Sequence, residues 1–349
     1  MSEAPRVSVV LPVHDGERWL SESIESVLGQ SLRELELIVV DDGSRDATPE
    51  ILAGFARRDP RVRVVAHEVN RGLIASLNHG VSLARGELVA RQDDDDVSLP
   101  ERLERQVAWL ERHPRVGLLG TDYYRVEETG RQLLRRPPRG DVEIRWRLLF
   151  GNVWCHASMM LRRELLHSEG PELYRLWLHA EDYELWVRLL ARSRGATLPE
   201  PLVRYRVHSS SVCALNEDLQ SEQVDEIARR QLAALLPELA DCGPDDLAAL
   251  RRCRKGRRMD ARALTAVPRL LALWKAFADR PDVDRPEVRR LRRMWLERVV
   301  AGLPLKDLPR LAGRGPLGSL ARREPRQVAR ALAVAWPGRR VRRLRKAFR

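Results

Sequence analysis

Short apolar runs alternate with helix-like segments over the first hundred residues. The runs are rich in Val, Leu and Ile, as buried β-strands are, and they lie at residues 6–13, 35–40, 62–66 and 87–91. The intervening segments place apolar residues at helical spacing, and they span residues 17–29, 48–58, 72–84 and 99–112. Thr48 is the expected cap of the second helix. This order predicts an α/β fold with a mostly parallel central sheet and helices on both faces.

The pattern changes at about residue 215. Strand-like runs disappear, and helical periodicity marks residues 221–236, 261–277 and 287–300. We therefore expect two parts: an α/β domain at residues 1–215 and a helical, Arg-rich region at residues 216–349.

Composition places the chain among globular proteins, with 44% hydrophobic and 32% charged residues. No apolar run approaches the roughly 20 residues that span a bilayer, and residues 1–6 do not resemble a secretory signal. The four cysteines lie far apart, without the spacing of a zinc site, at Cys155, Cys213, Cys242 and Cys253. We therefore expect a cytoplasmic protein without disulfides.

Charge divides the chain unevenly. Residues 251–349 carry 30 Lys and Arg against 8 Asp and Glu, whereas residues 1–250 carry 32 against 42. An acidic front part can hold a metal, and a basic rear part can meet an anionic surface.

Polar residues follow each expected strand. They lie at residues 12–16, 41–44, 70–72 and 93–96. Because ligands of such sheets bind at the carboxyl ends of the strands, we expect these residues to form one site.

The strongest chemical signal is the acidic run at residues 93–96, four consecutive aspartates after the fourth strand. Adjacent carboxylates repel one another, and Mg²⁺ or Mn²⁺ binds one or two carboxylates together with substrate phosphates. The alternative is a solvated acidic turn before the next helix. A second signal is Asp41-Asp42-Gly43-Ser44. Here a carboxylate can accept the N–H of a pyrimidine base, although the same residues suit an ordinary strand-to-helix turn.

Six segments, taken in order, resemble the motifs of family 2 glycosyltransferases with the GT-A fold. They are PVHDGERWL, VVDDGSRD, NRGLIASLNHG, ARQDDDDVSLPERL, AEDYELWVRL and LPEPLVRYRVHSSSV. The resemblance covers about residues 5–213. It implies an enzyme that takes a sugar from a nucleotide diphosphate donor with Mg²⁺ or Mn²⁺ as cofactor.

The resemblance also implies roles for individual residues on the donor side. Pro12, His14 and Asp15 would line the nucleotide. Asp42, with Asp41, would contact its base, uracil or an equivalent, and Arg71 would approach its ribose or diphosphate. Asp93 and Asp95 match the metal-binding D-x-D element, with Asp94 at the variable position. His208 matches a further metal or diphosphate contact, with a purely structural histidine as the alternative.

On the acceptor side, Asp182 matches the general base of the family's E-D pair. A carboxylate can take the proton of an acceptor hydroxyl as the new bond forms, and one base opposite one leaving group implies inversion. The alternative for Asp182 is a charge that complements the helix dipole. His156 matches an acceptor-side position, with a packed polar residue as the alternative.

The Q-x-x-R-W motif of polymerising synthases is absent: Arg145-Trp146 comes closest, but Val142 replaces the glutamine. We therefore expect transfer of a single sugar to a saccharide or lipid-linked saccharide, in cell-envelope polysaccharide or glycolipid synthesis. Two other functions stay open. A nucleotidyltransferase has such a sheet and acidic site, but it is expected to carry a Gly-rich basic loop after the first strand, where this chain has only one glycine. A non-catalytic scaffold that binds a nucleotide sugar or a membrane is the other, and it would not need the base Asp182.

The last segment, residues 320–349, interleaves Arg with Leu, Val and Trp. This pattern suits a helix on an anionic membrane surface, and a solvated Arg-rich surface is the alternative. We do not expect nucleic acid as a partner. The protein would then lie in the cytoplasm, peripherally at the inner face of the cell membrane.

Overall fold

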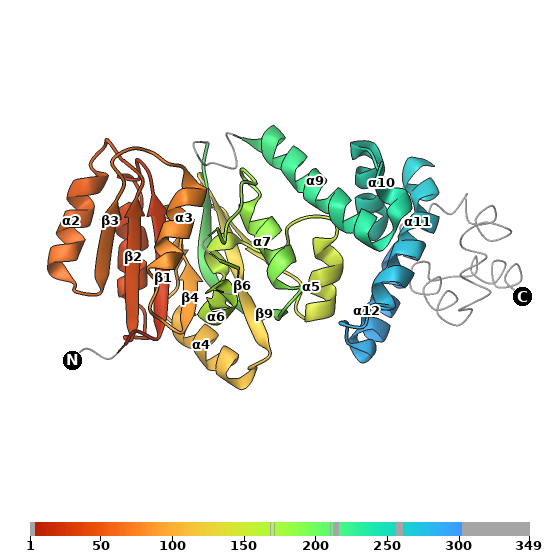
Figure 1. The fold of residues 1–349 in the computed structure, drawn as a ribbon, viewed down its shortest axis with the longest axis horizontal. Coiled ribbons are helices and arrows are strands. Elements are labelled where there is room, and N and C mark those ends of the chain that lie inside the picture. The colour runs from red at the N-terminus through yellow and green to blue at the C-terminus, as the bar shows by residue number, and fades with distance from the viewer. Residues whose placement is uncertain are drawn as a thin grey trace, which may run out of the picture. The chain divides into compact units, whose positions relative to one another are not determined.

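A computed structural model describes residues 4–167, 169–170, 172–209, 211, 216–255 and 261–301. The chain divides into two compact units, Met1–Val224 and Asp225–Arg349. Figure 1 follows both units along the chain, and each is described by itself below.

Four parallel strands form the first half of the sheet, in the order β3-β2-β1-β4. They span β1 (Val7–Val13), β2 (Leu35–Asp41), β3 (Val62–Ala66) and β4 (Leu88–Arg91). Every residue of β1 and β2 is buried, as expected of central strands covered on both faces. Because these strands run in parallel, their carboxyl ends, and the loops that follow, meet at one edge (Figure 1).

Helices cover both faces of these strands. They span α1 (Leu20–Leu28), α2 (Thr48–Arg58), α3 (Leu73–Ser82) and α4 (Arg102–Arg112). The odd-numbered residues of β1 share one core with apolar residues of α1, α2 and α4. On the other face, α3 packs closely, because a Cβ at Gly80 would lie 2.5 Å from Cγ1 of Val10. The expected α/β fold class is confirmed.

The expected cap of α2 was wrong. Ala47 is the N-cap, and Thr48 is the first helical residue. The Thr48 backbone N–H donates to Asp46 Oδ1 at 2.9 Å, and the Thr48 hydroxyl accepts the N–H of Gly16 at 2.9 Å. The Asp46 side chain therefore satisfies the N–H of the first helical residue, and the Thr48 hydroxyl joins the helix to the loop after β1.

The other half of the sheet is mixed. Its strands are β5 (Val97–Ser98), β6 (Val116–Glu127), β7 (Gln132–Arg135), β8 (Met160–Arg162) and β9 (Arg194–Val207). β8 joins the two halves, because it pairs antiparallel with both β4 and β6. Shorter helical elements lie between these strands: α5 (Asp141–Leu148), η1 (His156–Ser158), α6 (Arg163–His167) and α7 (Glu181–Leu189).

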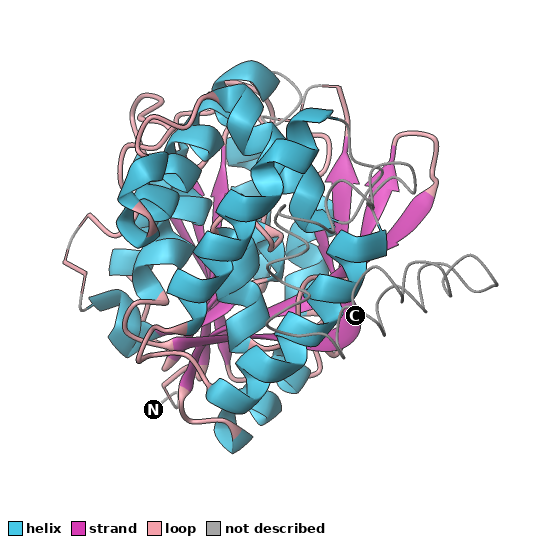
Figure 2. Cartoon of the chain, turned by 90° about the vertical axis from the view of Figure 1, so that its right-hand side faces the viewer, coloured by secondary structure: helices cyan, strands magenta, loops and turns pink. Residues whose placement is uncertain are grey.

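The second unit is helical, as Figure 2 shows for its described part. The boundary between the units falls within α9 (Glu217–Leu235), and η2 (Pro237–Leu239), α10 (Pro244–Lys255), α11 (Ala261–Ala278) and α12 (Arg285–Ala301) follow. Trp274 of α11 stacks on Trp295 of α12, with ring centroids 5.5 Å apart. The expected basic tail at residues 320–349 lies outside the described residues.

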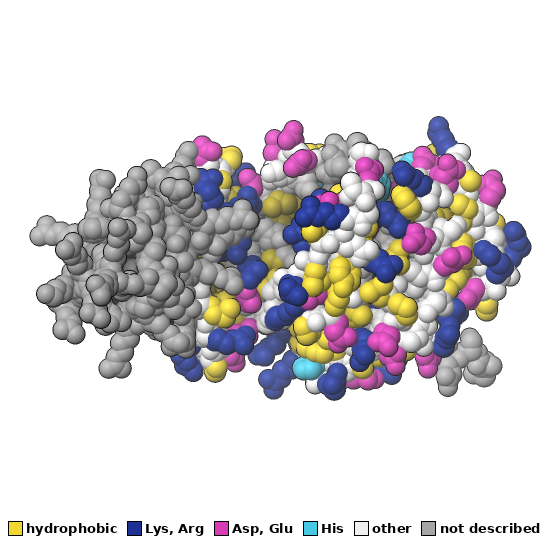
Figure 3. Space-filling model, turned by 180° about the vertical axis from the view of Figure 1, so that it is seen from behind, with side chains coloured by type: hydrophobic (Ala, Val, Ile, Leu, Met, Phe, Trp, Pro, Cys, Tyr) yellow, Lys and Arg dark blue, Asp and Glu magenta, His cyan; other side chains and the backbone are white. Residues whose placement is uncertain are grey.

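Within the described ranges, no helix is both long and apolar enough to cross a membrane. Cys155, Cys242 and Cys253 are free and buried, whereas Cys213 lies outside the described residues. On the face drawn in Figure 3, basic and acidic side chains of the described residues are interspersed.

Candidate active site

The loops after β1 and β2 bring together most of the residues expected to line the nucleotide. The Asp15 carboxylate accepts the backbone N–H of Arg45 at 2.8 Å, and the Asp15 N–H donates to Ser44 Oγ at 2.9 Å. Asp41 Oδ1 accepts the N–H of Ser44 at 3.0 Å. His14 is exposed, with Nε2 3.5 Å from Asp15. The two loops therefore form one hydrogen-bonded surface at the edge of the sheet.

The acidic turn, residues 93–96, follows β4 at the same edge. Asp94 lies against the first loop, because a Cβ at Gly16 would come 2.6 Å from Asp94 Oδ2. Asp95 Oδ2 lies 3.0 Å from His208 Nε2, just beyond the end of β9. Asp93 pairs with the buried guanidinium of Arg91. The structure thus joins the expected metal ligands Asp95 and His208, and it gives Asp93 a cationic partner.

Burial and mutual repulsion disfavour the charged forms within this turn. They raise the pKa of Asp94 to about 8 and also raise the pKa of Asp95, where the contact with His208 opposes the shift. The pKa of Asp96 is raised well above its usual range by burial and by Asp95 and Asp93. Asp96 Oδ1 accepts the N–H of Arg206 at 2.8 Å, whereas its buried Oδ2 has no hydrogen-bond partner. A cation placed at this turn would relieve the repulsion.

The donor set fits Mg²⁺ or Mn²⁺ as part of a shared site. Among the residues that the structure describes, no three His, Cys, Asp or Glu side chains converge to hold a metal ion by themselves. Such hard cations, however, are commonly held by one or two carboxylates together with phosphate oxygens of a substrate. Asp93 and Asp95 are suited to that arrangement.

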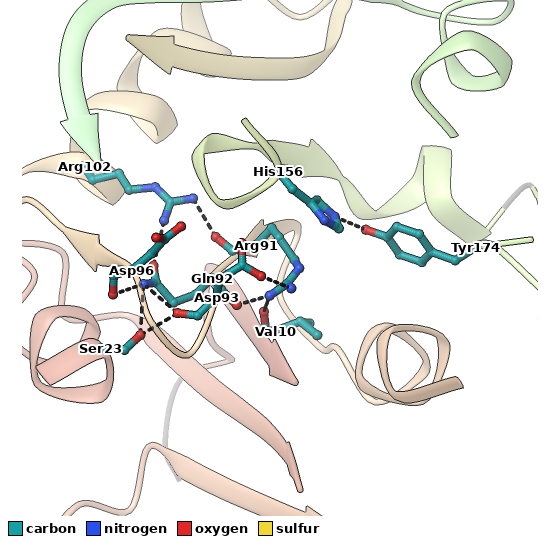
Figure 4. A network of polar contacts seen from close by, with 9 residues as sticks. All are labelled: Val10, Ser23, Arg91, Gln92, Asp93, Asp96, Arg102, His156 and Tyr174. Atoms are coloured by element: carbon teal, nitrogen blue, oxygen red, sulfur yellow. Dashed lines mark hydrogen bonds and ion pairs between the residues drawn. The ribbon is translucent and has the colours of Figure 1, made fainter. Parts of the chain in front are cut away.

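A buried polar network supports the acidic turn from behind (Figure 4). The Gln92 amide donates to Ser23 Oγ at 3.0 Å and to the carbonyl of Asp96 at 2.8 Å. The fully buried Arg102 donates to Gln92 Oε1, to Ser98 Oγ and to the carbonyl of Arg91, at 3.1, 2.8 and 2.8 Å. These bonds fix the backbone on both sides of the turn.

Asp182 lies in the first turn of α7, as the sequence implied. Its Oδ2 accepts a hydrogen bond from the Asn152 amide at 2.6 Å. Burial raises the pKa of Asp182 to about 6, the bonds from Asn152 and the backbone oppose that rise, and the charge of Asp93 adds to it. Asp182 and Asp93 are therefore within electrostatic reach of each other. Burial and the charge of Asp182 raise the pKa of the neighbouring Glu181 to about 8.

His156, in η1, points toward Tyr174 (Figure 4). Its Nε2 is 3.0 Å from Tyr174 Oη, and its ring meets Trp186 edge-on, with centroids 5.7 Å apart. Burial and the charge of Arg91 hold the pKa of His156 well below its usual range, so the ring is neutral. The backbone N–H and carbonyl of Tyr174 both bond to the Asn78 side-chain amide, at 2.8 and 2.9 Å.

Several residues of the site were missed by sequence reasoning. Arg91, Arg102 and Gln92 all lie within or beside the quoted acidic motif, and their polar or basic character in a buried segment was the available signal. Asn152 and Tyr174 carried no such signal, because they reach the site only through the tertiary fold.

Residues 8–169 match the family described as Glycosyl transferase family 2. EpsE of Bacillus subtilis, named as a glycosyltransferase, is 36% identical over 217 residues, which are 60% of this chain and 76% of EpsE. The amylovoran biosynthesis glycosyltransferase AmsE of Erwinia amylovora is 32% identical over 209 residues, 59% of this chain and 77% of AmsE.

Two solved structures share the fold at low identity. Residues 1–349 of Staphylococcus aureus TarS, in complex with UDP-GlcNAc, superpose with a TM-score of 0.55 at 20% identity, covering 94% of this chain and 91% of that chain. The mannosyltransferase PcManGT of Pyrobaculum calidifontis, in complex with GDP-Man and Mn²⁺, gives 0.51 at 18% identity, covering 99% and 85%. The likeness confirms the expected GT-A fold. The family match over residues 8–169 and the similarity to EpsE show that this chain belongs to glycosyltransferase family 2.

Proposed function

We propose that this chain is an inverting, metal-dependent glycosyltransferase that moves a single sugar from a nucleotide diphosphate donor to a hydroxyl acceptor. The observation that carries the proposal is the position of Asp182. It is a partly exposed carboxylate with a pKa raised to about 6, and it lies within electrostatic reach of the acidic turn. A base with this pKa is ionised at neutral pH and is more basic than an ordinary aspartate.

Asp182 would accept the proton of the acceptor hydroxyl as the oxygen attacks the anomeric carbon. The Asn152 amide, 2.6 Å from Asp182 Oδ2, orients the carboxylate and stabilises its charged form. His156 is neutral and hydrogen-bonded to Tyr174, so it adds no positive charge to the site. A single base opposite a single leaving group supports one in-line displacement, and hence inversion.

On the donor side, the loops after β1 and β2 would bind the nucleotide through Pro12, His14, Asp15 and Asp41. Asp42 would hold the loop from which Arg71 approaches the diphosphate. Asp93, Asp95 and His208 would hold Mg²⁺ or Mn²⁺, and the bound cation would supply electrostatic stabilisation of a diphosphate leaving group. Arg102 and Gln92 hold the backbone of the acidic turn in place for this task.

The comparisons support a nucleotide-sugar donor and a role in envelope polysaccharide synthesis. TarS is described in complex with UDP-GlcNAc and PcManGT with GDP-Man and Mn²⁺, and AmsE is named for amylovoran biosynthesis. We infer a UDP-sugar as donor and a saccharide or lipid-linked saccharide as acceptor. We also propose that residues 1–215 form the catalytic domain and residues 216–349 a separate helical region.

A panel of nucleotide sugars tests the proposal. The protein is incubated with UDP-, GDP- and TDP-sugars, each with Mn²⁺, Mg²⁺ or EDTA, and the release of nucleoside diphosphate is measured. We expect release with one donor class, loss of release with EDTA, and an inverted anomeric configuration in the product by NMR. Absence of release with every donor, or a retained configuration, would overturn the proposed reaction.

The Arg-rich tail carries a separate part of the proposal: contact with an anionic membrane at the cytoplasmic face. Full-length protein is expected to sediment with phosphatidylglycerol vesicles and not with phosphatidylcholine vesicles, because its basic residues attract anionic headgroups. Equal sedimentation after deletion of residues 320–349 would remove the tail from this role.

A further inference from the structure

Two histidines, one buried and one partly buried, lie behind the donor side of the site, outside the residues to which a role has been given above. His67, which follows β3, places Nδ1 2.7 Å from Asp42 Oδ1 and Nε2 2.9 Å from Nδ1 of His79 on α3. The two imidazole rings stack, with centroids 5.2 Å apart and an angle of 4° between their planes. The side chains of His67 and Asp42 are only 4% and 5% exposed. The three residues thus form one continuous chain through the interior.

Asp42 is the anchor of the loop at residues 69–72. Its Oδ1 also accepts the N–H of Arg71 at 2.9 Å, and its Oδ2 accepts the N–H of Gly72 at 2.7 Å. Burial alone would raise the pKa of Asp42, but the bonds from His67 and from these two N–H groups outweigh it and lower the pKa below its usual range. Asp42 is therefore a charged, buried carboxylate whose hydrogen bonds point into the protein.

The loop packs directly on the turn that follows Asp42. Gly43 has a φ of +71°, and a Cβ there would lie 2.7 Å from the carbonyl carbon of Val69 and 2.8 Å from the nitrogen of Asn70. No side chain can separate the two segments at this point, and two hydrogen bonds join Asp42 to the loop. A rotation of the Asp42 carboxylate would therefore move the loop and the exposed Arg71 with it.

The two histidines fix that rotation. The ionised Asp42 can only accept a hydrogen bond from His67, so Nδ1 of His67 carries the proton and donates it to this bond. Burial and the nearby charges of His67 and Arg71 lower the pKa of His79, and one proton then bridges Nε2 of His67 and Nδ1 of His79. His79 thereby sets the ring orientation of His67, and His67 sets the orientation of the carboxylate, much as a second residue orients a metal-bound histidine.

We propose that His67 and His79 are positioning residues for nucleotide binding: they hold Asp42, and through it the loop that carries Arg71, in the conformation that receives the donor. The inference rests on the proposed function, because the loop matters only if a nucleotide binds at this edge. Neither histidine touches the donor. Their effect is expected in donor affinity and not in the chemical step.

Four histidine variants and one control test the proposal. His79→Leu removes the contact with His67, and His79→Asn keeps a polar atom near the position of Nδ1. His67→Asn retains the bond to Asp42 but not the bond to His79, and His67→Leu removes both. His113→Ala is the control, because His113 is exposed at the end of α4, where its ring bonds to the carbonyl of Trp109 and stacks on the Trp109 ring. Binding of UDP and of GDP with Mn²⁺ is measured by calorimetry, with melting temperatures for each variant.

We expect His67→Leu to weaken nucleotide binding about tenfold, which corresponds to about 1.4 kcal/mol. For His79→Leu we expect about threefold, the loss of one hydrogen bond. His67→Asn should fall between these two, and His79→Asn and His113→Ala should bind as the wild type does. The donor KM should rise in parallel, with kcat and the acceptor KM unchanged.

The outcomes separate this inference from the proposed function. A wild-type protein that binds neither UDP nor GDP would contradict the proposed function. Wild-type binding that persists unchanged in a folded His79→Leu variant would contradict the positioning role alone. If His67→Leu does not fold, His79→Leu decides, because His79 is only partly buried. Imidazole ¹⁵N shifts that show no proton on His67 Nδ1 would also overturn the inference.

Discussion

The acidic turn after β4 and the start of α7 both contain neighbouring carboxylates, but their surroundings differ. In the turn, the carboxylates of residues 93–96 repel one another, and the pKa of Asp94 rises to about 8. At α7, Asp182 has a hydrogen bond from Asn152, which opposes the effect of burial, and its pKa rises only to about 6. The same side chain thus suits cation binding in one place and proton transfer in the other, because different groups face it.

The largest expected effect separates the two regions by function. Asp182→Asn removes the base and keeps the size of the side chain. General-base catalysis contributes about 10²- to 10⁴-fold, so kcat should fall by about a thousandfold, while the affinity for nucleoside diphosphate with Mn²⁺ stays close to that of the wild type. Steady-state kinetics and calorimetry measure the two. An equal loss of nucleotide binding would assign Asp182 to structure or to the metal.

The next variant addresses the donor side. Asp95→Asn removes a proposed metal ligand and leaves His208 without an anionic partner. We expect activity to fall by about a hundredfold and the apparent Mn²⁺ affinity, measured by electron paramagnetic resonance with UDP present, to fall with it. Unchanged Mn²⁺ binding would place the cation elsewhere.

The pH profile tests the acceptor side. A base works when it has lost its proton, so kcat/KM should fall as the pH drops through about 6, the pKa of Asp182, and should level off above it. Because the Asn152 bond stabilises the charged carboxylate, Asn152→Ala should move this limb to higher pH. A limb that does not move would show that another group titrates.

The smallest effect is expected at Asp94. Burial and its neighbours already favour the neutral form of this carboxyl group near pH 7, so Asp94→Asn changes its charge little. Activity should stay within about threefold of wild type, a change of less than about 1 kcal/mol. The assay is the same as for Asp95→Asn, and a loss as large as in that variant would make Asp94 a metal ligand.

The first half of the fold followed from the sequence because local pattern and tertiary position agree there. β3 spans Val62–Ala66, as its Val-rich run predicted, and α2 ends at Arg58 as expected. The pairing of the strands in the mixed half of the sheet could not be predicted from the sequence. β8 has only three residues, yet it joins β4 to β6, and so short a strand leaves no periodic pattern to read.

The site divides in the same way. The acidic turn and Asp182 lie within contiguous motifs, so their residues were found, although their individual roles stay predictions. The network around Arg102 lies mostly within one of these motifs, at buried polar residues that were overlooked. The chain from Asp42 to His79, by contrast, depends on contacts between residues far apart in sequence. His67 and His79 lie 25 and 37 positions after Asp42. Nothing in their local sequence indicates that they meet.

Helix α3 gives this arrangement one more consequence. Two neighbouring residues of α3 contact different parts of the site: Asn78 bonds to the backbone of Tyr174, and His79 bonds to His67. Helix α3 therefore connects the loop of the proposed nucleotide site to Tyr174, on the proposed acceptor side. If α3 shifts along its axis, both contacts move together. Saturation of the enzyme with one substrate should therefore change its affinity for the other.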